Sequence, residues 1–519
     1  MKKTPAARAF LAAAIIGAAA AGVSRAAAAG FEVYEKSILE LQAAQTAGKV
    51  SARGLVEAYI TRIEAYDRAG PRLNSIAALN PRALEEADAL DRERARKGPR
   101  GPLHGVPILV KDNFDVVGMA TGGGSIALAT LRPEHDAFQV KRLRAAGAVI
   151  LGKTTMHELA AGITTQSSLT GITRNPYDPA RWPGGSSGGT GAAVAASLAA
   201  AGLGTDTSGS IQIPSSFQNL FGLRPTRGLT SRGGVMPMSS SQDVAGPMAR
   251  SVTDLAILLD ATVGRDPSDP ASVDARRWIP KSYRDALQSG GLEGVRIGVE
   301  RSLFGDAEQD REVADIVLAA LAVMQAQGAE LIEVSLPILS ERLVESETTE
   351  YEFKFDLAGY LRAHPGAPVG SLSEILERGL YSKALERRLR SWNTPQVLDT
   401  PRYREVLALR ATLREAVLDA FREQRLDALA YPGTTRKPAL IGTSQGGWGA
   451  GCQLSPATGL PQLAVPVGFS AEGLPVGMAL LGLDFAEPVL LKLAYAWERS
   501  QRLRRAPAGT PALAGIVGR

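Results

Sequence analysis

The alternation of short aliphatic runs with an amphipathic segment between residues 105 and 154 constrains the fold more than any other feature of the chain. The runs "GVPILVKD" and "AVILGKT" have the length of buried strands, and "DAFQVKRLRAAG" between them has helical spacing. Strand, helix and strand in this order are typical of a sheet with helices packed on it. We therefore predict an α/β fold.

The rest of the chain adds further elements to this unit. Residues 340–425 are strongly helical and charged, which predicts a helical cap or insertion, and residues 171–234 are rich in glycine and serine, which predicts an active-site region of loops on the sheet. Other predicted helices cover 51–70, 81–98, 190–202, 351–364, 403–424 and 488–501, and other predicted strands cover 294–300, 462–469 and 475–482.

Residues 1–29 have the pattern of a secretory signal peptide. A basic start precedes an apolar run from Ala9 to Val23, and the small residues from Ala26 to Ala29 suit cleavage. An uncleaved membrane anchor is the alternative, but the run is shorter than the roughly 20 residues that span a bilayer. We expect an exported protein, periplasmic or secreted, with no stable membrane association after cleavage.

Charge argues against nucleic acid as a partner. The formal net charge of the whole chain is +5, and four of its basic residues lie in the predicted signal, so the mature chain carries about +1. Nucleic-acid-binding proteins usually present a strongly basic surface. We therefore expect no nucleic-acid partner.

Two motif matches fail on their context. "GAVILGKT", from Gly147 to Thr154, fits the phosphate-binding loop of nucleotide hydrolases, but the residues between its glycines are the strand itself and cannot wrap a phosphate. "GSSGG", from Gly185 to Gly189, fits the nucleophile elbow of serine hydrolases, but no strand leads into it. His364 is the only histidine after that serine, so the sequence offers a single candidate for the histidine of a Ser-His-Asp triad of that kind.

Other common sites are also missing from the sequence. "MHELAA" lacks the second histidine of a zinc protease, and no lysine follows a serine by three residues as in penicillin-binding proteins. The single cysteine, Cys452, excludes an internal disulfide and is expected to be a small buried side chain.

A serine-lysine arrangement remains. Lys111 ends an apolar strand, where desolvation lowers the pKa of a lysine and makes it a competent base. Two glycine-serine loops follow, "GGSSGG" at 184–189 and "GTDTSGS" at 204–210, with backbone N–H groups suited to an oxyanion hole. Each loop alone is better explained as a tight turn with incidental serines. Their combination with Lys111 favours a hydrolase.

Five stretches resemble the amidase signature family, in the order and spacing expected for it. They are "GPLHGVPILVKDNFDV", "GAVILGKTTMHE", "RNPYDPARWPGGSSGGTGAAVAA", "LGTDTSGSIQIPSSFQNLFGLRPTRGLTSRGG" and "DVAGPMARSVTDLAILL". The resemblance extends from about Ser51 to Arg502. It implies one domain over residues 30–519, with a central mixed, twisted sheet, helices on both faces and the helical insertion at about 340–425. It implies no cofactor and no metal.

The resemblance also implies roles for individual residues. Ser210 corresponds to the nucleophile, Ser186 to a bridging serine with an unusual cis peptide geometry, and Lys111 to the ultimate base. The backbone N–H groups implied for the oxyanion hole are those of Thr207, Ser208, Gly209 and Ser210, and the implied supporting residues are Ser187 and Asp206.

The chain departs from the commonest family pattern at two positions. Ser208 stands where the family often has glycine, and Gln212 where it often has arginine, which points to a different shape of the acyl pocket. "YEFK" at 351–354 and "SQDVAGPMARSV" are similar to bacterial peptide amidases, which remove the C-terminal amide of peptides.

We therefore expect an exported amidase that hydrolyses a small-molecule or peptide amide and releases an amine or ammonia. The alternatives are an aryl-acylamide, ester, carbamate or urea hydrolase with the same triad, the transamidating subunit of a tRNA-dependent amidotransferase, and a non-catalytic binding protein. The predicted export signal and the near-neutral charge oppose the amidotransferase. The complete set of Lys111, Ser186 and Ser210 opposes the binding protein.

Overall fold

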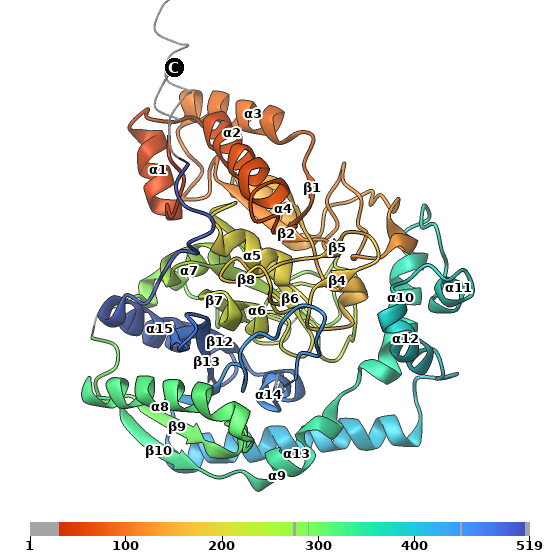
Figure 1. The fold of residues 1–519 in the computed structure, drawn as a ribbon, viewed down its shortest axis with the longest axis vertical. Helices are drawn as coiled ribbons and strands as arrows, with labels where there is room; N and C mark the ends of the chain where they lie inside the picture. Colours follow the sequence, from red (N-terminus) through yellow and green to blue (C-terminus); the bar gives the residue numbers. More distant parts are fainter. Residues whose placement is uncertain (1–30, 273–276, 289, 447–448, 514–519) are drawn as a thin grey trace, which may run out of the picture.

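A mixed sheet runs through the centre of the protein (Figure 1). The computed structural model describes residues 31–272, 277–288, 290–446 and 449–513, so the predicted signal peptide lies outside the described residues. In the described residues the sheet has eleven strands, which in spatial order are β1 (Ile76–Leu79), β3 (Val149–Thr154), β2 (Pro107–Lys111), β6 (Ala201–Asp206), β8 (Val244–Ala249), β7 (Phe221–Arg224), β12 (Gln462–Phe469), β13 (Pro475–Leu481), β11 (Ala428–Pro432), β9 (Arg296–Glu300) and β10 (Glu330–Val334). A separate hairpin joins β4 (Gln166–Ser167) to β5 (Gly171–Ile172).

The strands that were predicted from aliphatic runs lie where the sheet is fully covered. β2 is parallel to β3 and β6, and β9 is parallel to β10 and β11, whereas the other neighbours are antiparallel. Every residue of β2 and β3 is buried, as expected for continuous apolar strands covered on both faces. The predicted α/β class with a central mixed sheet is confirmed.

Helices cover the sheet and extend beyond it. They are α1 (Ile38–Thr46), α2 (Ala52–Ile63), α3 (Ala83–Lys97), α4 (Phe138–Ala145), α5 (Gly188–Ala195), α6 (Gln212–Phe217), α7 (Val252–Thr262), α8 (Arg311–Ala326), α9 (Pro337–Arg342), α10 (Thr349–Arg362), α11 (Leu372–Glu377), α12 (Glu386–Trp392), α13 (Pro401–Gln424), α14 (Gly451–Thr458) and α15 (Glu487–Gln501). Ser51 caps α2 by accepting a hydrogen bond from the N–H of Gly54, which satisfies one free donor of the first turn. No helix in the described ranges is long and apolar enough to cross a membrane.

The helix predicted over 190–202 is wrong in its second half. α5 ends at Ala195, Ser197 has a left-handed φ of 56°, and β6 begins at Ala201. The run of alanine and glycine fits a tightly packed helix and a buried strand equally well, so its sequence does not separate the two. Pairing of β6 with β2 and β8 decides for the strand.

Between β10 and β11 the chain is helical, as expected for residues 340–425. Helices α10, α11 and α12 form a lobe to one side of the sheet (Figure 1). Phe353, Leu357, Ile375 and Trp392 belong to a hydrophobic cluster of their own in this lobe, which also includes Leu128. The lobe therefore has its own apolar packing and also contacts the loops that follow β2.

Candidate active site

Lys111 is the last residue of β2 and is completely buried. Its Nζ donates hydrogen bonds to Ser186 Oγ at 2.7 Å and to Thr205 Oγ1 at 2.7 Å. Burial lowers the pKa of Lys111 to about 7, although the negative charges of Asp206 and Asp243 act in the opposite direction. A large fraction of Lys111 is therefore a neutral amine near pH 7.

Ser186 and Ser187 lie in the loop that leads into α5. The peptide bond between Gly185 and Ser186 is cis, as the family resemblance implied. Ser187 N–H donates to the carbonyl oxygen of Ser210 at 3.2 Å, and Ser187 Oγ donates to the carbonyl oxygen of Thr205 at 3.0 Å. Ser187 thus joins the two predicted glycine-serine loops to each other and to the end of β6.

Asp206 shapes the loop that carries Ser210. It is the last residue of β6, and its carboxylate accepts hydrogen bonds from the N–H groups of Gly209 at 2.9 Å and Ile211 at 2.7 Å. Arg224 forms a buried ion pair with the same carboxylate at 3.1 Å. Gly209 has a φ of 91°, and a Cβ there would lie 2.8 Å from Cβ of Cys452, so only glycine fits.

Backbone N–H groups of this loop are available to a ligand. Within the described residues, no hydrogen bond is made by the N–H of Thr207, Ser208 or Ser210, whereas the N–H of Gly209 is held by Asp206. Three of the four donors that the sequence assigned to an oxyanion hole are thus open, and Gly209 instead fixes the loop. This arrangement can stabilise a developing negative charge on a carbonyl oxygen.

A cavity of about 860 Å³ opens onto this loop. Thr207, Ser208 and Ser210 line it on the side of the sheet. The residues of the helical segment that line the opposite side include Glu347, Tyr351, Arg388 and Trp392. Ser210 is 6% exposed, and in the part of the chain that the structure describes its hydroxyl makes no hydrogen bond. Its Oγ is therefore free to meet a substrate that enters the cavity.

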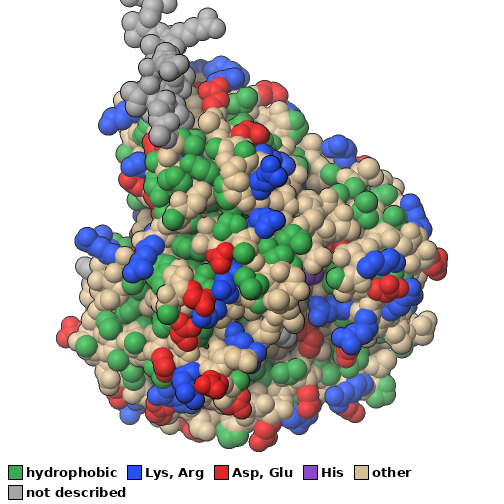
Figure 2. Space-filling model, viewed as in Figure 1, with side chains coloured by type: hydrophobic (Ala, Val, Ile, Leu, Met, Phe, Trp, Pro, Cys, Tyr) green, Lys and Arg blue, Asp and Glu red, His purple; other side chains and the backbone are tan. Residues whose placement is uncertain are grey.

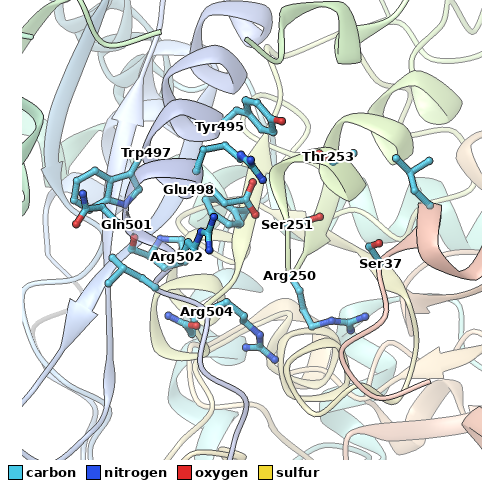
Figure 3. A pocket seen from close by; sticks show the side chains of 16 residues that line it. Ser37, Arg250, Ser251, Thr253, Tyr495, Trp497, Glu498, Gln501, Arg502 and Arg504 are labelled. Carbon is cyan, nitrogen blue, oxygen red and sulfur yellow. Dashed lines mark hydrogen bonds between the residues drawn. The ribbon is translucent and has the colours of Figure 1, made fainter. Parts of the chain in front are cut away.

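Another hollow, of about 470 Å³, lies beside the C-terminal end of α15 (Figure 3). Arg250, Glu498 and Arg502 line it, and none of the sequence-predicted site residues does. The face shown in Figure 2 carries Lys and Arg side chains interspersed with Asp and Glu. This face has no continuous basic surface.

Sequence reasoning missed several residues that hold the site. Thr205 accepts hydrogen bonds from both Lys111 and Asn113. Asp243 accepts one from Thr207 Oγ1 at 2.6 Å. Thr205 and Asp243 both lie in stretches that resemble the family, but their contacts depend on strand pairing, which single-sequence patterns do not give.

Comparison with known proteins identifies the family. The model of the family described as Amidase matches residues 54–491. The chain belongs to the amidase signature family. As a member of this family it is an enzyme of the kind that acts on amides, and its fold matches the solved structures of that family.

Individual relatives differ in what their names say. The chain is 38% identical to a glutamyl-tRNA(Gln) amidotransferase subunit from Halorhodospira halophila over 90% of this chain and 97% of that protein. It is similar to the crystal structure of the native peptide amidase from Stenotrophomonas maltophilia, with a TM-score of 0.84, 39% identity and coverage of 92% and 99%. An amidase family protein from Bacillus anthracis gives a TM-score of 0.82 at 32% identity, with coverage of 92% of each chain.

Proposed function

We propose that this amidase hydrolyses primary carboxamides, including the C-terminal amides of peptides, and releases ammonia. The observation that carries the proposal is the buried Lys111 with a pKa of about 7, hydrogen-bonded to Ser186 beside the loop of Ser210. A lysine that is largely neutral near pH 7 can act as a base, and the Ser186 hydroxyl that it contacts can relay a proton.

We propose the following reaction for these residues. Neutral Lys111 takes the proton of Ser186 as Ser186 takes the proton of Ser210, and Ser210 Oγ forms a bond to the amide carbon. The N–H groups of Thr207 and Ser208 donate hydrogen bonds to the carbonyl oxygen and stabilise its negative charge. The proton returns through Ser186 to the leaving nitrogen, the C–N bond breaks, and ammonia leaves. Water then loses a proton by the same route, attacks the acyl-enzyme and releases the carboxylic acid and Ser210.

Burial around the relay supports a small leaving group. The leaving nitrogen must reach Ser186 to gain a proton, and both Ser186 and Lys111 have no exposed surface. Neither belongs to the 860 Å³ cavity that contains Ser210. An NH₂ group fits such a closed space better than the aromatic amine of an anilide. The large cavity is left for the acyl part, and similarity to the peptide amidase of Stenotrophomonas maltophilia supports a peptide there.

The second candidate is a component of a tRNA-dependent amidotransferase. The names of the curated relatives favour it, because the relatives from Halorhodospira halophila and Thermus thermophilus, at 38% and 36% identity, are both named as glutamyl-tRNA(Gln) amidotransferase components. The export pattern in residues 1–29 speaks against it, since charged tRNA is a cytoplasmic substrate. We propose that the chain is exported to the periplasm or secreted.

Purified protein that begins at Gly30 tests the proposed activity. It would be incubated with primary carboxamides, peptide amides, anilides, carbamates and ureas, and the release of ammonia or amine measured for wild type and Ser210→Ala. We expect ammonia from primary amides without any partner protein, loss of at least about 10³-fold in Ser210→Ala, and labelling of wild type alone by a fluorophosphonate. Turnover of anilides only, or no turnover and no labelling, would contradict the proposal.

Localisation has a separate test. Full-length protein would be expressed in a Gram-negative host, the periplasm and cytoplasm separated, and the N-terminal sequence determined. A periplasmic protein that begins near Gly30 is expected. An intact cytoplasmic protein would contradict export and favour the amidotransferase candidate.

A further inference from the structure

Glu347 lies directly against the loop that carries Ser210. It precedes α10 and lines the 860 Å³ cavity. One carboxylate oxygen accepts a hydrogen bond from Ser208 Oγ at 2.9 Å. The other accepts hydrogen bonds from Gln242 Nε2 at 3.0 Å and from the N–H of Thr349 at 3.2 Å, and also from the Thr349 hydroxyl. Four hydrogen bonds therefore hold this carboxylate beside the predicted oxyanion hole.

None of the groups that donate hydrogen bonds to Glu347 carries a positive charge. Ser208, Gln242 and Thr349 are uncharged donors, and the N-terminus of the 14-residue helix α10 stabilises a negative charge. No ion pair in the described part of the chain includes Glu347. The carboxylate of Glu347 thus has four uncharged hydrogen-bond donors and no hydrogen bond from a cation at the wall of the cavity.

The nearest cations are engaged elsewhere. Arg410 donates to Gln242 Oε1 at 2.9 Å and to the backbone carbonyls of Ser346, Ser241 and Pro456. Arg388, which lines the same cavity, donates to the backbone carbonyl of Ala161. Both guanidinium groups moderate the field of Glu347, but neither forms a hydrogen bond with its carboxylate.

Other acidic residues extend this negative region of the cavity. Glu345 and Glu350 are exposed in the same lining, and Glu345 pairs with Arg342 at 2.9 Å. Arg402, a cation of that lining, pairs with Glu405 at 3.0 Å. A cationic group on a substrate would therefore be attracted into the cavity, and Glu347 is the acid that contacts the catalytic loop.

The position of Glu347 beside Ser208 indicates that the cationic group of the substrate lies near its carbonyl group. A carbonyl oxygen bound by the N–H of Ser208 lies about 2.9 Å from that nitrogen, and Glu347 is one hydrogen bond away from the side chain of the same residue. The acyl group attached to that carbonyl carbon therefore enters the cavity that Ser208 and Glu347 both line. We propose that Glu347 selects amides with an ammonium group on the carbon next to the carbonyl, that is, the amides of free α-amino acids. This narrows the substrates proposed above, because the corresponding nitrogen of a peptide amide is an uncharged amide nitrogen.

This inference rests on the proposed amidase function and is tested with two substrates of equal shape. L-Leucinamide carries the ammonium group, and in 2,4-dimethylpentanamide a methyl group replaces it. The α-amino group has a pKa of about 8, so leucinamide is mostly cationic at pH 7. We expect wild type to show a kcat/KM about 10- to 100-fold higher for leucinamide, the range of a charged hydrogen bond.

Glu347→Gln keeps the size of the side chain and removes its charge. We expect this variant to lose the preference, mainly through a higher KM for leucinamide, and to change kcat/KM for 2,4-dimethylpentanamide by less than about threefold. Glu341→Gln, an exposed acid on α9 outside the cavity, is the control and should retain the preference. A second readout needs no variant: the preference of wild type should disappear between pH 7 and 9, as the amine of leucinamide loses its proton.

Equal losses with both substrates would mean that Glu347 only supports the loop, and the inference would be wrong. A wild-type preference for the neutral amide, or one that persists at pH 9, would also overturn it. Each of those results leaves the proposed amidase function intact. Failure to hydrolyse either compound or any other primary amide, together with an unreactive Ser210, would refute both.

Discussion

Replacing Lys111 with methionine should abolish hydrolysis and make the folded protein more stable at pH 7. One pH unit of pKa difference corresponds to about 1.4 kcal/mol, and burial lowers the pKa of Lys111 from 10.5 to about 7. Keeping this lysine buried therefore costs about 4 to 5 kcal/mol at pH 7, relative to a lysine of ordinary pKa. Methionine removes this cost together with the bonds from Nζ to Ser186 and Thr205, which contribute about 1 kcal/mol each. The expected net gain is about 2 to 3 kcal/mol.

The pH dependence of this gain identifies its cause. Below pH 7 Lys111 is protonated in both the folded and the unfolded state. Between pH 7 and 10.5 the unfolded state binds about one proton more, so wild-type stability rises relative to Lys111→Met by about 1.4 kcal/mol per pH unit. The two proteins should become equally stable near pH 9. Urea unfolding followed by tryptophan fluorescence at pH 7, 8 and 9 measures the difference directly.

A buried lysine of a different kind supplies the control. Lys153 is equally buried but lies 3.3 Å from Asp112 in an ion pair. Lys153→Met leaves the carboxylate of Asp112 buried without its cation, so it should destabilise the protein by about 3 kcal/mol or more. If Lys111→Met instead lowers stability by an amount that does not change with pH, the folded-state pKa of Lys111 is near its ordinary value, and the argument for a neutral base is wrong.

Two further predictions follow from the same site. First, kcat/KM for a primary amide should fall about tenfold per pH unit below pH 7, because Lys111 must be neutral to accept a proton; a profile that stays flat down to pH 5 would contradict this role. Second, Asp206→Asn should destabilise the protein by about 3 to 5 kcal/mol, because it leaves Arg224 buried without its anion. It should also lower kcat, because an NH₂ group replaces one of the two oxygens that accept from the N–H groups of Gly209 and Ile211. Urea unfolding and steady-state kinetics check the second prediction, and wild-type kcat in the variant would show that Asp206 does not hold the loop.

The sequence predicted those parts of the fold whose pattern is local. The aliphatic runs that precede Lys111 and Lys153 form strands because their consecutive apolar residues are buried on both faces of the sheet. The amphipathic helices at both ends of the chain are found where their periodicity places them. The run from Thr190 to Gly202 has no periodicity, because alanine and glycine fit either structure, and this is where the prediction was wrong.

The candidate site was predictable only in part. Lys111, Ser186 and Ser210 could be named from the family resemblance, and the structure brings their segments together, but their roles stay predictions until Ser210 is tested. Glu347 could not be found from sequence, because it is 139 residues from Ser208 and lies in the helical segment where the resemblance is weakest. Its position depends on how α10 packs above the loop, which no local pattern encodes.

The topology of the sheet explains why a lysine can act as a base here. β2 and β6 are parallel neighbours, with Val110 opposite Leu203, so both strands end at the same edge and Lys111 reaches Thr205 across the pair. β8 runs antiparallel beside β6, with Val244 opposite Asp206, which brings Asp243 to Thr207. Lys111 is desolvated because β2 lies inside the sheet, with β3 on one side and β6 on the other. At an edge strand, water would reach Nζ, and the pKa would return toward 10.5. The low pKa of Lys111 therefore results from the position of β2 inside the sheet. The same desolvation that makes Lys111 a base at neutral pH also lowers the stability of the folded protein.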